Sequence, residues 1–284
     1  MIAAKAYVIG DPVAHSLSPL LHQTWLDEVG IAGSYQAILA KPDAVTDIVR
    51  ELFADPNTMG INVTLPHKQR ALAFADEVTP LARRTGAANF LYRKNGRIIA
   101  DNTDIEGFLQ PLLKTIERKE LSGLCALVFG AGGAARAVLA ALLAAKTSQI
   151  LLCNRSDDKA EALCAELGVA QLKTIRWAQR NQPGPAPDLV INASSAGMTG
   201  YDALDVDLAF CGPNTVIYDL VYSPLVTPLL VRAAASNLKH IGGLEMLISQ
   251  ARPCFELFFG VQAPTSSRVH EVLSKALLAK QRAQ

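Results

Sequence analysis

The segment VFGAGGAARA, residues 128–137, constrains the fold of this chain more than any other part of the sequence. The apolar run at 124–129 is too short for a helix and is typical of a strand buried on both faces. The stretch at 134–145 is dense in alanine and leucine, which favour a helix. The sequence therefore predicts a strand that turns sharply into a helix, more than a hundred residues into the chain.

Three glycines occupy the predicted turn, namely Gly130, Gly132 and Gly133. Glycine permits both the sharp turn and a close approach of the backbone to a ligand. The N–H groups and the positive end of the following helix suit a pyrophosphate. A tight turn that binds no ligand has the same pattern. The residues after the next strand distinguish a dinucleotide site from such a turn.

The next strand is predicted at 149–153, and NAD sites place an acidic residue just beyond its end to accept from the ribose 2′-hydroxyl. This chain instead has Asn154, Arg155 and Ser156, with Lys159 one turn later. A guanidinium grips a 2′-phosphate with a planar fork of donors, so the pattern favours NADP as the cofactor. A solvated surface arginine is the alternative.

The composition narrows the class of protein. A length of 284 residues indicates two domains or one large one. A net charge of +1 and a pI near 7.7 give no general electrostatic reason to bind nucleic acid or an anionic membrane. Half of the residues are hydrophobic and 19% are charged, so a large core is available and disorder is not expected.

The stretch at 124–145 has the length of a membrane span, but its glycines and Arg136 interrupt it at the predicted turn. Within ten residues the N-terminal segment reaches Gly10, Asp11 and Pro12, which leaves too short an apolar region for a signal peptide. We expect a soluble, cytoplasmic protein.

Five scattered cysteines form no CxxC pair and are expected to be small core residues in a reducing compartment. The five histidines form no HxxxH pair, so no metal is expected.

Strand-like and helix-like segments alternate through the first hundred residues. Strands are predicted at 6–9, 35–39 and 61–65, and helices at about 19–29, over 45–53 and from Pro66, a residue favoured in a first turn. Asn95-Gly96 predicts a tight hairpin between 90–92 and 97–100. This half is expected to form a mostly parallel sheet with an antiparallel piece.

A second alternating series begins near residue 124, with further strands at 149–153, 189–192 and 216–219. The predicted fold class is α/β, with two open α/β domains, of which the C-terminal one is a Rossmann-type NADP-binding domain. An active-site cleft is expected between the two domains, because open sheets bind ligands at the carboxyl ends of their strands.

Four polar clusters interrupt the apolar pattern of the first half where strands end. They are AHSLSP (14–19), NVTLPHK (62–68), GAANF (86–90) and DNTD (101–104). Their hydroxyls, amides and one Lys/Asp pair suit a small, polyhydroxylated, anionic substrate. Taken singly, each residue also has a purely structural explanation. Ser18 and Thr64 fit helix caps, Asn89 fits a turn, and Lys68 fits a solvated surface position.

Taken together, these segments resemble the shikimate and quinate dehydrogenase family nearly from end to end. The matching motifs are GDPVAHSLSPLLH, INVTLPHK, GAANF, DNTDIEGF, VFGAGGAARA, NRSDDKA, INASSAGM, YDLVYSP, GGLEMLISQA and FELFFG, in this order. The resemblance implies NADPH-dependent reduction of 3-dehydroshikimate to shikimate, in the pathway toward aromatic amino acids.

The resemblance also assigns roles in the substrate half. Lys68 and Asp104 would be the catalytic pair, in which Asp104 orients Lys68 and stabilises its charge. The substrate carboxylate would be held by Ser16, Ser18 and Tyr222, and the ring hydroxyls by Asn62, Thr64, Asn89 and Gln250.

In the cofactor half, the turn would hold the pyrophosphate with Gly130, Ala131, Gly132, Gly133 and Ala134. The 2′-phosphate would be bound by Asn154, Arg155, Ser156 and Lys159, and Met198 and Gly243 would lie near the nicotinamide. Met198 also fits simple loop packing.

We expect a substrate domain of residues 1–104 and 243–284, with the cofactor domain at 105–242 between them. Gln250 then belongs to the returning C-terminal helices, and Pro253 is expected to limit its helix. Monomer and homodimer are both left open.

Three departures from the family pattern leave alternatives open: Phe90 after GAAN, Ile105 after NTD, and the pair Phe258-Phe259. The first two flank proposed substrate residues, so a quinate or aminoshikimate dehydrogenase is an alternative. A regulator that senses NADP without catalysis is a more remote one, although it has no need of Lys68 and Asp104. The paired serines argue against a reductase of aldehydes or imines.

Overall fold

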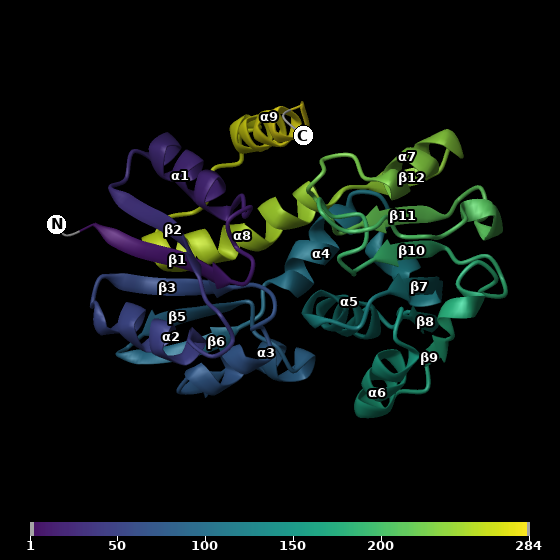
Figure 1. The fold of residues 1–284 in the computed structure, drawn as a ribbon, viewed down its shortest axis with the longest axis horizontal. Helices are drawn as coiled ribbons and strands as arrows, with labels where there is room; N and C mark the ends of the chain where they lie inside the picture. Colours follow the sequence, from purple (N-terminus) through teal and green to yellow (C-terminus); the bar gives the residue numbers. More distant parts are fainter. Residues whose placement is uncertain (1–2, 283–284) are drawn as a thin grey trace. The chain divides into compact units, whose positions relative to one another are not determined.

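The computed structural model describes residues 3–282, apart from the side chains of residues 118 and 119. Contacts within the chain divide it into two units, each visible in Figure 1. The first unit holds the chain up to Asp104 together with Ile248–Ala276. The second holds Ile105–Leu247 and the chain from Leu277 onward.

The first unit is built on a six-stranded sheet with the order β2-β1-β3-β5-β6-β4. Its strands are β1 (Ala4–Gly10), β2 (Gly33–Leu39), β3 (Thr58–Val63), β4 (Glu77–Val78), β5 (Phe90–Lys94) and β6 (Arg97–Asp101). β1 pairs in parallel with β2 and β3, and β5 is antiparallel to β3 and β6. The hairpin turn has positive φ at Asn95 and Gly96, as the sequence predicts.

Successive side chains of β3 point to opposite faces of this sheet. Ile61 and Val63 pack in the core with α2 (Val45–Ala54) and α3 (Pro80–Thr85). Asn62 points to the other face, where its amide lies 3.3 Å from Cys254 of α8 (Gly243–Phe259). Helix α8 packs directly on the strand, because a Cβ at Gly60 would lie 2.1 Å from the Phe258 ring. The remaining helices are α1 (Ser18–Val29), the 3-10 helix η1 (Arg70–Phe74) and α9 (Arg268–Arg282).

The second unit contains a six-stranded parallel sheet with the order β12-β11-β10-β7-β8-β9. Its strands are β7 (Cys125–Phe129), β8 (Gln149–Cys153), β9 (Leu172–Ile175), β10 (Leu189–Asn192), β11 (Val216–Asp219) and β12 (Lys239–Ile241). Counted from its own first strand, this is the 3-2-1-4-5-6 order of dinucleotide-binding domains. The glycine turn follows β7, beside the point where the strand order reverses.

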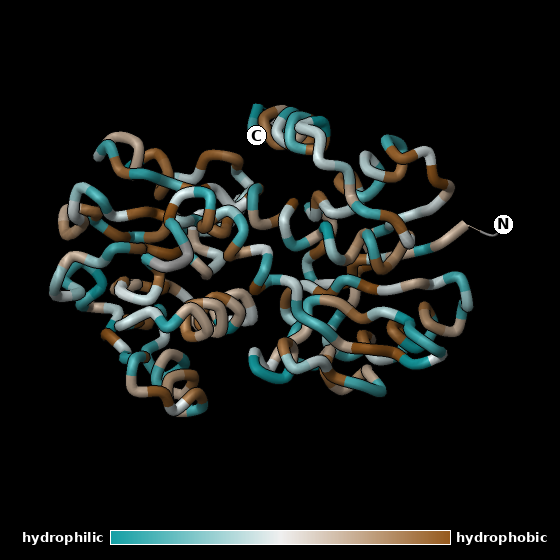
Figure 2. Tube along the Cα trace, turned by 180° about the vertical axis from the view of Figure 1, so that it is seen from behind, coloured by the Kyte–Doolittle hydropathy of each residue, from teal (hydrophilic) through white to brown (hydrophobic). Residues whose placement is uncertain are grey.

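Helices cover both faces of the second sheet. Alternate strand residues pack in one core with α4 (Asp104–Leu113) and α5 (Gly133–Ala144), and in a second core with α7 (Pro228–Ala235). The other helices are α6 (Asp157–Leu167) and the 3-10 helices η2 (Arg118–Gly123), η3 (Trp177–Gln179) and η4 (Leu208–Phe210). Figure 2 shows that hydrophobic and hydrophilic stretches alternate along the chain in both units.

Two local predictions are wrong. No α-helix begins at Pro66: a turn follows β3, and the short 3-10 helix begins at Arg70. The buried ring of His67 holds this turn, since its Nε2 lies 2.6 Å from the carbonyl of Ala40. Pro253 does not limit its helix either, because α8 runs through it to Phe259 and is held by aromatic packing on the sheet.

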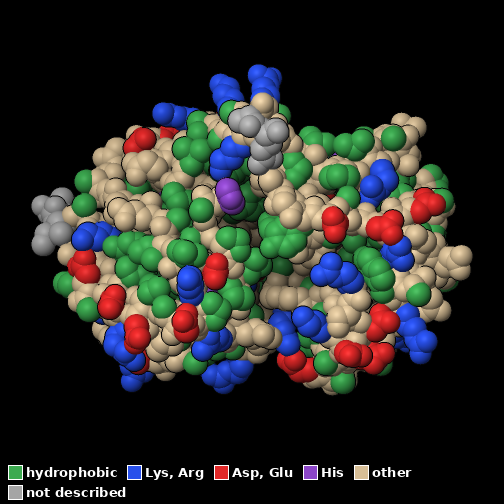
Figure 3. Space-filling view, viewed as in Figure 1, with side chains coloured by type: hydrophobic (Ala, Val, Ile, Leu, Met, Phe, Trp, Pro, Cys, Tyr) green, Lys and Arg blue, Asp and Glu red, His purple; other side chains and the backbone are tan. Residues whose placement is uncertain are grey.

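The stretch with the length of a membrane span is divided into β7 and α5. Within residues 3–282, no helix is long and apolar enough to cross a membrane. On the face shown in Figure 3, side chains of both charges are interspersed, in line with a net charge of +1.

Candidate active site

An ion pair joins two of the polar clusters of the first unit. The ammonium of Lys68, in the turn after β3, lies 2.5 Å from Oδ2 of Asp104, the first residue of α4. Only 16% of the lysine side chain and 6% of the aspartate side chain are exposed. The backbone of Lys68 is fixed as well, because its carbonyl accepts from the N–H of Ala88 at 2.8 Å. The two groups predicted as a catalytic pair are therefore in contact.

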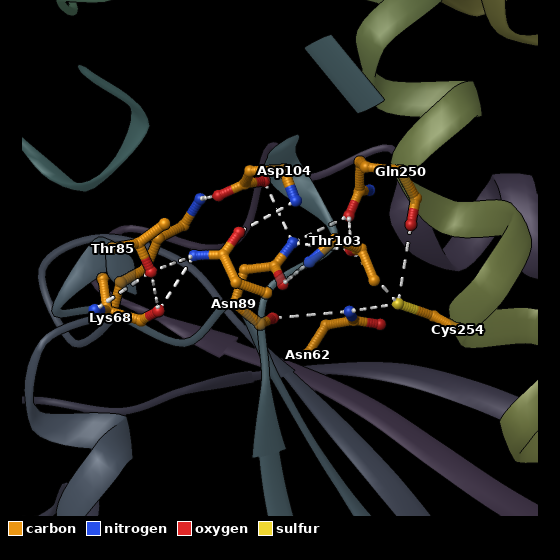
Figure 4. A network of polar contacts seen from close by, with 10 residues as sticks. Asn62, Lys68, Thr85, Asn89, Thr103, Asp104, Gln250 and Cys254 are labelled. Carbon is orange, nitrogen blue, oxygen red and sulfur yellow. Dashed lines mark hydrogen bonds and ion pairs between the residues drawn. The ribbon is translucent and has the colours of Figure 1, made fainter. Parts of the chain in front are cut away.

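Asn89 holds the other side of this carboxylate (Figure 4). Its Nδ2 lies 3.0 Å from Oδ1 of Asp104, 2.8 Å from the hydroxyl of Thr103 and 3.2 Å from Oε1 of Gln250. Its Oδ1 accepts from the backbone N–H of Thr103 at 2.8 Å. Both oxygens of Asp104 are thus engaged, one by Lys68 and one by Asn89, which fixes the plane of the carboxylate.

The side chain of Asn102 fixes the start of α4. Its Oδ1 accepts from the backbone N–H of Asp104 at 3.0 Å, so this amide takes the place of a helix cap. Its Nδ2 donates to the carbonyl of Ala87 at 2.9 Å and to the hydroxyl of Thr85 at 3.2 Å. Asn102 therefore ties the GAANF segment to the DNTD segment that carries Asp104.

Asn62, Gln250 and Cys254 close the network on the side of α8 (Figure 4). The Nδ2 of Asn62 lies 3.3 Å from the Cys254 sulfur and 3.4 Å from the carbonyl of Asn89. Gln250 and Cys254 project from adjacent turns of α8. Gln250, a residue late in the chain, thus lies beside Asn89.

The remaining predicted substrate residues of the first unit follow β1 and β3. Ser16 accepts from the backbone N–H of Ser18 at 3.3 Å, and Ser18 lies inside α1 without capping it. Thr64 is beside the end of β1, because its Cγ2 would lie 2.3 Å from a Cβ at Gly10. The polar groups that follow the two strands therefore share one edge of the sheet. Tyr222 belongs to the second unit.

The glycine turn of the second unit has the features that a pyrophosphate requires. Gly130 has a φ of +116°, and a Cβ there would lie 2.8 Å from the carbonyl oxygen of Ala193. Gly132 caps α5 without a side-chain hydrogen bond, and a Cβ there would meet nothing within 4 Å. Since no side chain caps the helix and the backbone is open, the N–H groups of its first turn can bind phosphate oxygens. Ala131, Gly133 and Ala134 complete this segment.

The residues predicted at the 2′-phosphate follow β8 and lead into α6. Arg155, Ser156 and Lys159 are exposed, and the Nδ2 of Asn154 donates to the carbonyl of Ser156 at 2.9 Å. Two cations with accessible heads at this position fit a phosphorylated ribose. The donor set of the unit therefore fits NADP.

Asp219 ties together the loops that carry Met198 and Tyr222. Its carboxylate accepts from the amide of Asn192 at 2.9 Å and from the hydroxyl of Thr227 at 2.6 Å. It also accepts from the backbone N–H of Val221 at 3.0 Å. These bonds join the end of β10, the end of β11 and the start of α7.

The start of α8 joins the same group of loops. A Cβ at Gly243 would lie 2.2 Å from the carbonyl oxygen of Leu220, so only glycine fits there. The N–H of Thr199, next to Met198, donates to the carbonyl of Ser223 at 2.8 Å. The structure thus brings the loops of Met198, Tyr222 and Gly243 together within the second unit.

Comparisons with known proteins agree with both units. Residues 8–91 match the family model of the shikimate dehydrogenase substrate binding domain, and residues 112–206 match that of shikimate / quinate 5-dehydrogenase. The chain is 41% identical to shikimate dehydrogenase (NADP(+)) of Paramagnetospirillum magneticum, covering 94% of this chain and 96% of the relative. The chain belongs to the shikimate dehydrogenase family.

Two further family members show the extent of the likeness. Shikimate dehydrogenase (NADP(+)) of Sphingopyxis alaskensis is 44% identical over 91% of this chain and 92% of its own length. The crystal structure of shikimate 5-dehydrogenase from Thermus thermophilus, in complex with NADP(H) and shikimate, is 35% identical with a TM-score of 0.84. That likeness covers 96% of this chain and 100% of the crystallised one.

Two of the departures from the family pattern lie in the cores. Phe90 is fully buried, and its ring packs against Tyr92 and Phe258, with centroids 5.1 and 6.0 Å away. Ile105 is buried in the core of the second unit with Phe108. Both residues therefore affect packing, and neither gives a reason to favour quinate or aminoshikimate.

Sequence reasoning missed several residues of these networks, and five of them make the contacts that matter most for the proposals below. They are Tyr35, Asn102, Thr103, Asp219 and Cys254. For Asp219 a signal was present, because it is a charged residue at the end of an otherwise apolar strand. Asn102 and Thr103 stand inside the DNTD cluster. Tyr35 and Cys254 carry no local signal, since each has the pattern of an ordinary core residue.

Burial raises the pKa of Asp219 to about 6, although its three hydrogen bonds and the nearby Arg232 lower it. The ordinary value is 3.8, so the folded chain holds the Asp219 proton more tightly than the unfolded chain does. The stability that comes from this protonation is complete below about pH 4 and is lost as the pH rises through about 6.

We therefore expect the free energy of unfolding to depend on pH through Asp219. Between about pH 4.5 and about pH 7.5, the wild type should lose roughly 2 kcal/mol relative to Asp219→Asn, which has no group to titrate there. Urea unfolding of both proteins at both pH values measures this difference. A difference between the two proteins that stays constant with pH would contradict the assignment.

Proposed function

We propose that this chain catalyses the reversible, NADP-dependent reduction of 3-dehydroshikimate to shikimate. The observation that carries the proposal is the Lys68–Asp104 ion pair, with both carboxylate oxygens engaged, among the amides and hydroxyls of the first unit. The names and ligands of the relatives support the same reaction.

Lys68 performs the proton transfer in this proposal. NADPH supplies the hydride when it is bound. As negative charge develops on the ketone oxygen, the ammonium of Lys68 stabilises it and donates a proton. In the reverse direction, the amine of Lys68 accepts the proton of the hydroxyl. Asp104 holds Nζ in place through a 2.5 Å contact and does not need to move during the reaction.

The substrate is held by polar groups near the ends of strands and by one residue of α8. Ser16, Ser18 and Tyr222 bind its carboxylate, and Asn62, Thr64 and Gln250 bind its ring hydroxyls. The main role of Asn89 in this proposal is a different one. Its Nδ2 already faces three acceptors within 3.2 Å, so its main task is to position Asp104. Its Oδ1 accepts from the Thr103 N–H, and the second lone pair of that oxygen is left for a hydroxyl.

The cofactor is held by the second unit. The glycine turn, Gly130 to Ala134, binds the pyrophosphate at the start of α5, and Asn154, Arg155, Ser156 and Lys159 bind the 2′-phosphate. Met198 and Gly243 lie on the joined loops that receive the nicotinamide. Residues 1–104 and 248–276 act as the substrate domain, and 105–247 as the cofactor domain.

The cytoplasm is the proposed location, since a reducing compartment keeps five free cysteines reduced. Monomer and homodimer both suit the proposed chemistry, because one chain supplies every residue of the Lys68–Asp104 network.

We expect the purified protein to reduce NADP with shikimate and to be much less active with quinate or aminoshikimate. Lys68→Ala should lower kcat about 10²- to 10⁴-fold, because it removes the acid–base group, and should leave the circular dichroism spectrum unchanged. Lys275→Ala removes an exposed lysine of α9 and is the matched control, with unchanged kcat. Steady-state absorbance of NADPH measures all of these rates. Cofactor reduction only with quinate, only with aminoshikimate, or with none of the three would refute the proposed substrate.

A second variant tests the cofactor assignment. Arg155→Ala should raise the KM for NADP about tenfold or more and change the KM for NAD little, since NAD lacks the 2′-phosphate. Arg268→Ala, which removes an exposed arginine at the start of α9, should change neither KM. Equal increases for NADP and NAD would show that Arg155 does not bind the 2′-phosphate.

A further inference from the structure

The side-chain amide of Asn62 has a defined orientation. Its Oδ1 accepts from the hydroxyl of Tyr35 at 2.7 Å, and its Nδ2 faces the carbonyl of Asn89 at 3.4 Å and the sulfur of Cys254 at 3.3 Å. A backbone carbonyl can only accept, so the amide atom that faces Asn89 must be the nitrogen. Oδ1 must therefore face Tyr35, whose hydroxyl is the donor.

Counting donors and acceptors leaves one free site on this amide. Asn has two N–H donors and two carbonyl lone pairs. Both donors face acceptors of the protein, and Tyr35 occupies one lone pair. The remaining group is the second lone pair of Oδ1. A ligand that meets Asn62 therefore meets an acceptor, which favours a hydroxyl and disfavours a ketone or ether oxygen at that place.

Tyr35 is itself held by its ring. It lies on β2, is 5% exposed, and stacks on His22 with centroids 4.0 Å apart and an interplanar angle of 4°. Burial lowers the pKa of His22 to about 3, so this ring is neutral at working pH and adds no charge beside Tyr35. Because stacking holds the ring, removal of the hydroxyl alone leaves the packing in place.

We propose that Tyr35 is a positioning residue, whose hydroxyl orients Asn62 so that the free lone pair of Oδ1 accepts from a ring hydroxyl of the substrate. This proposal rests on the proposed function of the first unit. It specifies the direction of the hydrogen bond between Asn62 and the substrate: the ring hydroxyl donates and Oδ1 of Asn62 accepts.

A double-mutant cycle tests this role. We expect Tyr35→Phe to raise the KM for shikimate about 3- to 10-fold, the worth of one hydrogen bond, with kcat and the KM for NADP changed less than about twofold. Asn62→Ala should also raise the KM for shikimate. In the Asn62→Ala background, Tyr35→Phe should have less than about a twofold effect, because no amide remains to be oriented.

Tyr7→Phe is the matched control, since Tyr7 packs with the core on the opposite face of the same sheet, and it should change no constant. Far-UV circular dichroism and the midpoint of thermal unfolding check the fold of each variant. An equal increase of KM in both backgrounds would overturn the proposal and leave the function intact, because Tyr35 would then act through packing. An unchanged KM for Tyr35→Phe would overturn it as well. A wild type without turnover of shikimate would overturn both proposals.

Discussion

The contact between Lys68 and Asp104 is the interaction on which the rest of the site depends. A lysine ammonium is a compact charge on a flexible stem, and it serves as an acid only if something fixes it. Here Asp104 fixes Nζ, Asn89 fixes Asp104, and Asn102 fixes the first turn of α4. Each link is a hydrogen bond of 3.0 Å or less in a poorly exposed place, where breaking it would leave a buried polar group unsatisfied.

The residues of this network come from segments on both sides of the cofactor unit in the sequence. The network draws on the turn after β3, the segment before β5, the start of α4 and the middle of α8. The chain leaves the first unit directly after Asp104, builds the whole dinucleotide-binding sheet, and returns at Ile248 with Gln250 and Cys254. The cofactor unit is thus an insertion in sequence, which is why the glycine turn stands in mid-chain.

Local patterns predicted much of the fold. β8, β10 and β11 have the expected bounds, and the Asn95-Gly96 hairpin forms, because apolar runs and glycine turns act over a few residues. The helix expected at Pro66 failed because a buried contact of His67 with Ala40, which sequence does not reveal, holds a turn there. The prediction that Pro253 limits its helix failed for a similar reason. Packing of α8 on the sheet outweighs the loss of the backbone N–H donor that proline lacks.

In the site, too, local patterns indicate some residues, and only contacts between distant segments identify others. Lys68 and Asp104 stand in polar clusters at predicted strand ends, so the sequence marks them. Tyr35 and Cys254 do not stand out, because their importance lies in contacts with Asn62 from 27 and 192 residues away. Only the folded chain shows such pairs. Asp219 lies between these cases, as a visible polar residue whose three partners come from different loops.

The most direct test of the account is the coupling between Lys68 and Asp104 in catalysis. If Asp104 acts only by holding Lys68, then kcat for the Asp104→Asn/Lys68→Ala double variant should equal that of Lys68→Ala within about threefold. Asp104→Asn alone should still lower kcat substantially. Losses that multiply, so that the double variant is slower than Lys68→Ala by the full Asp104→Asn factor, would contradict the claim that the two residues work as one unit.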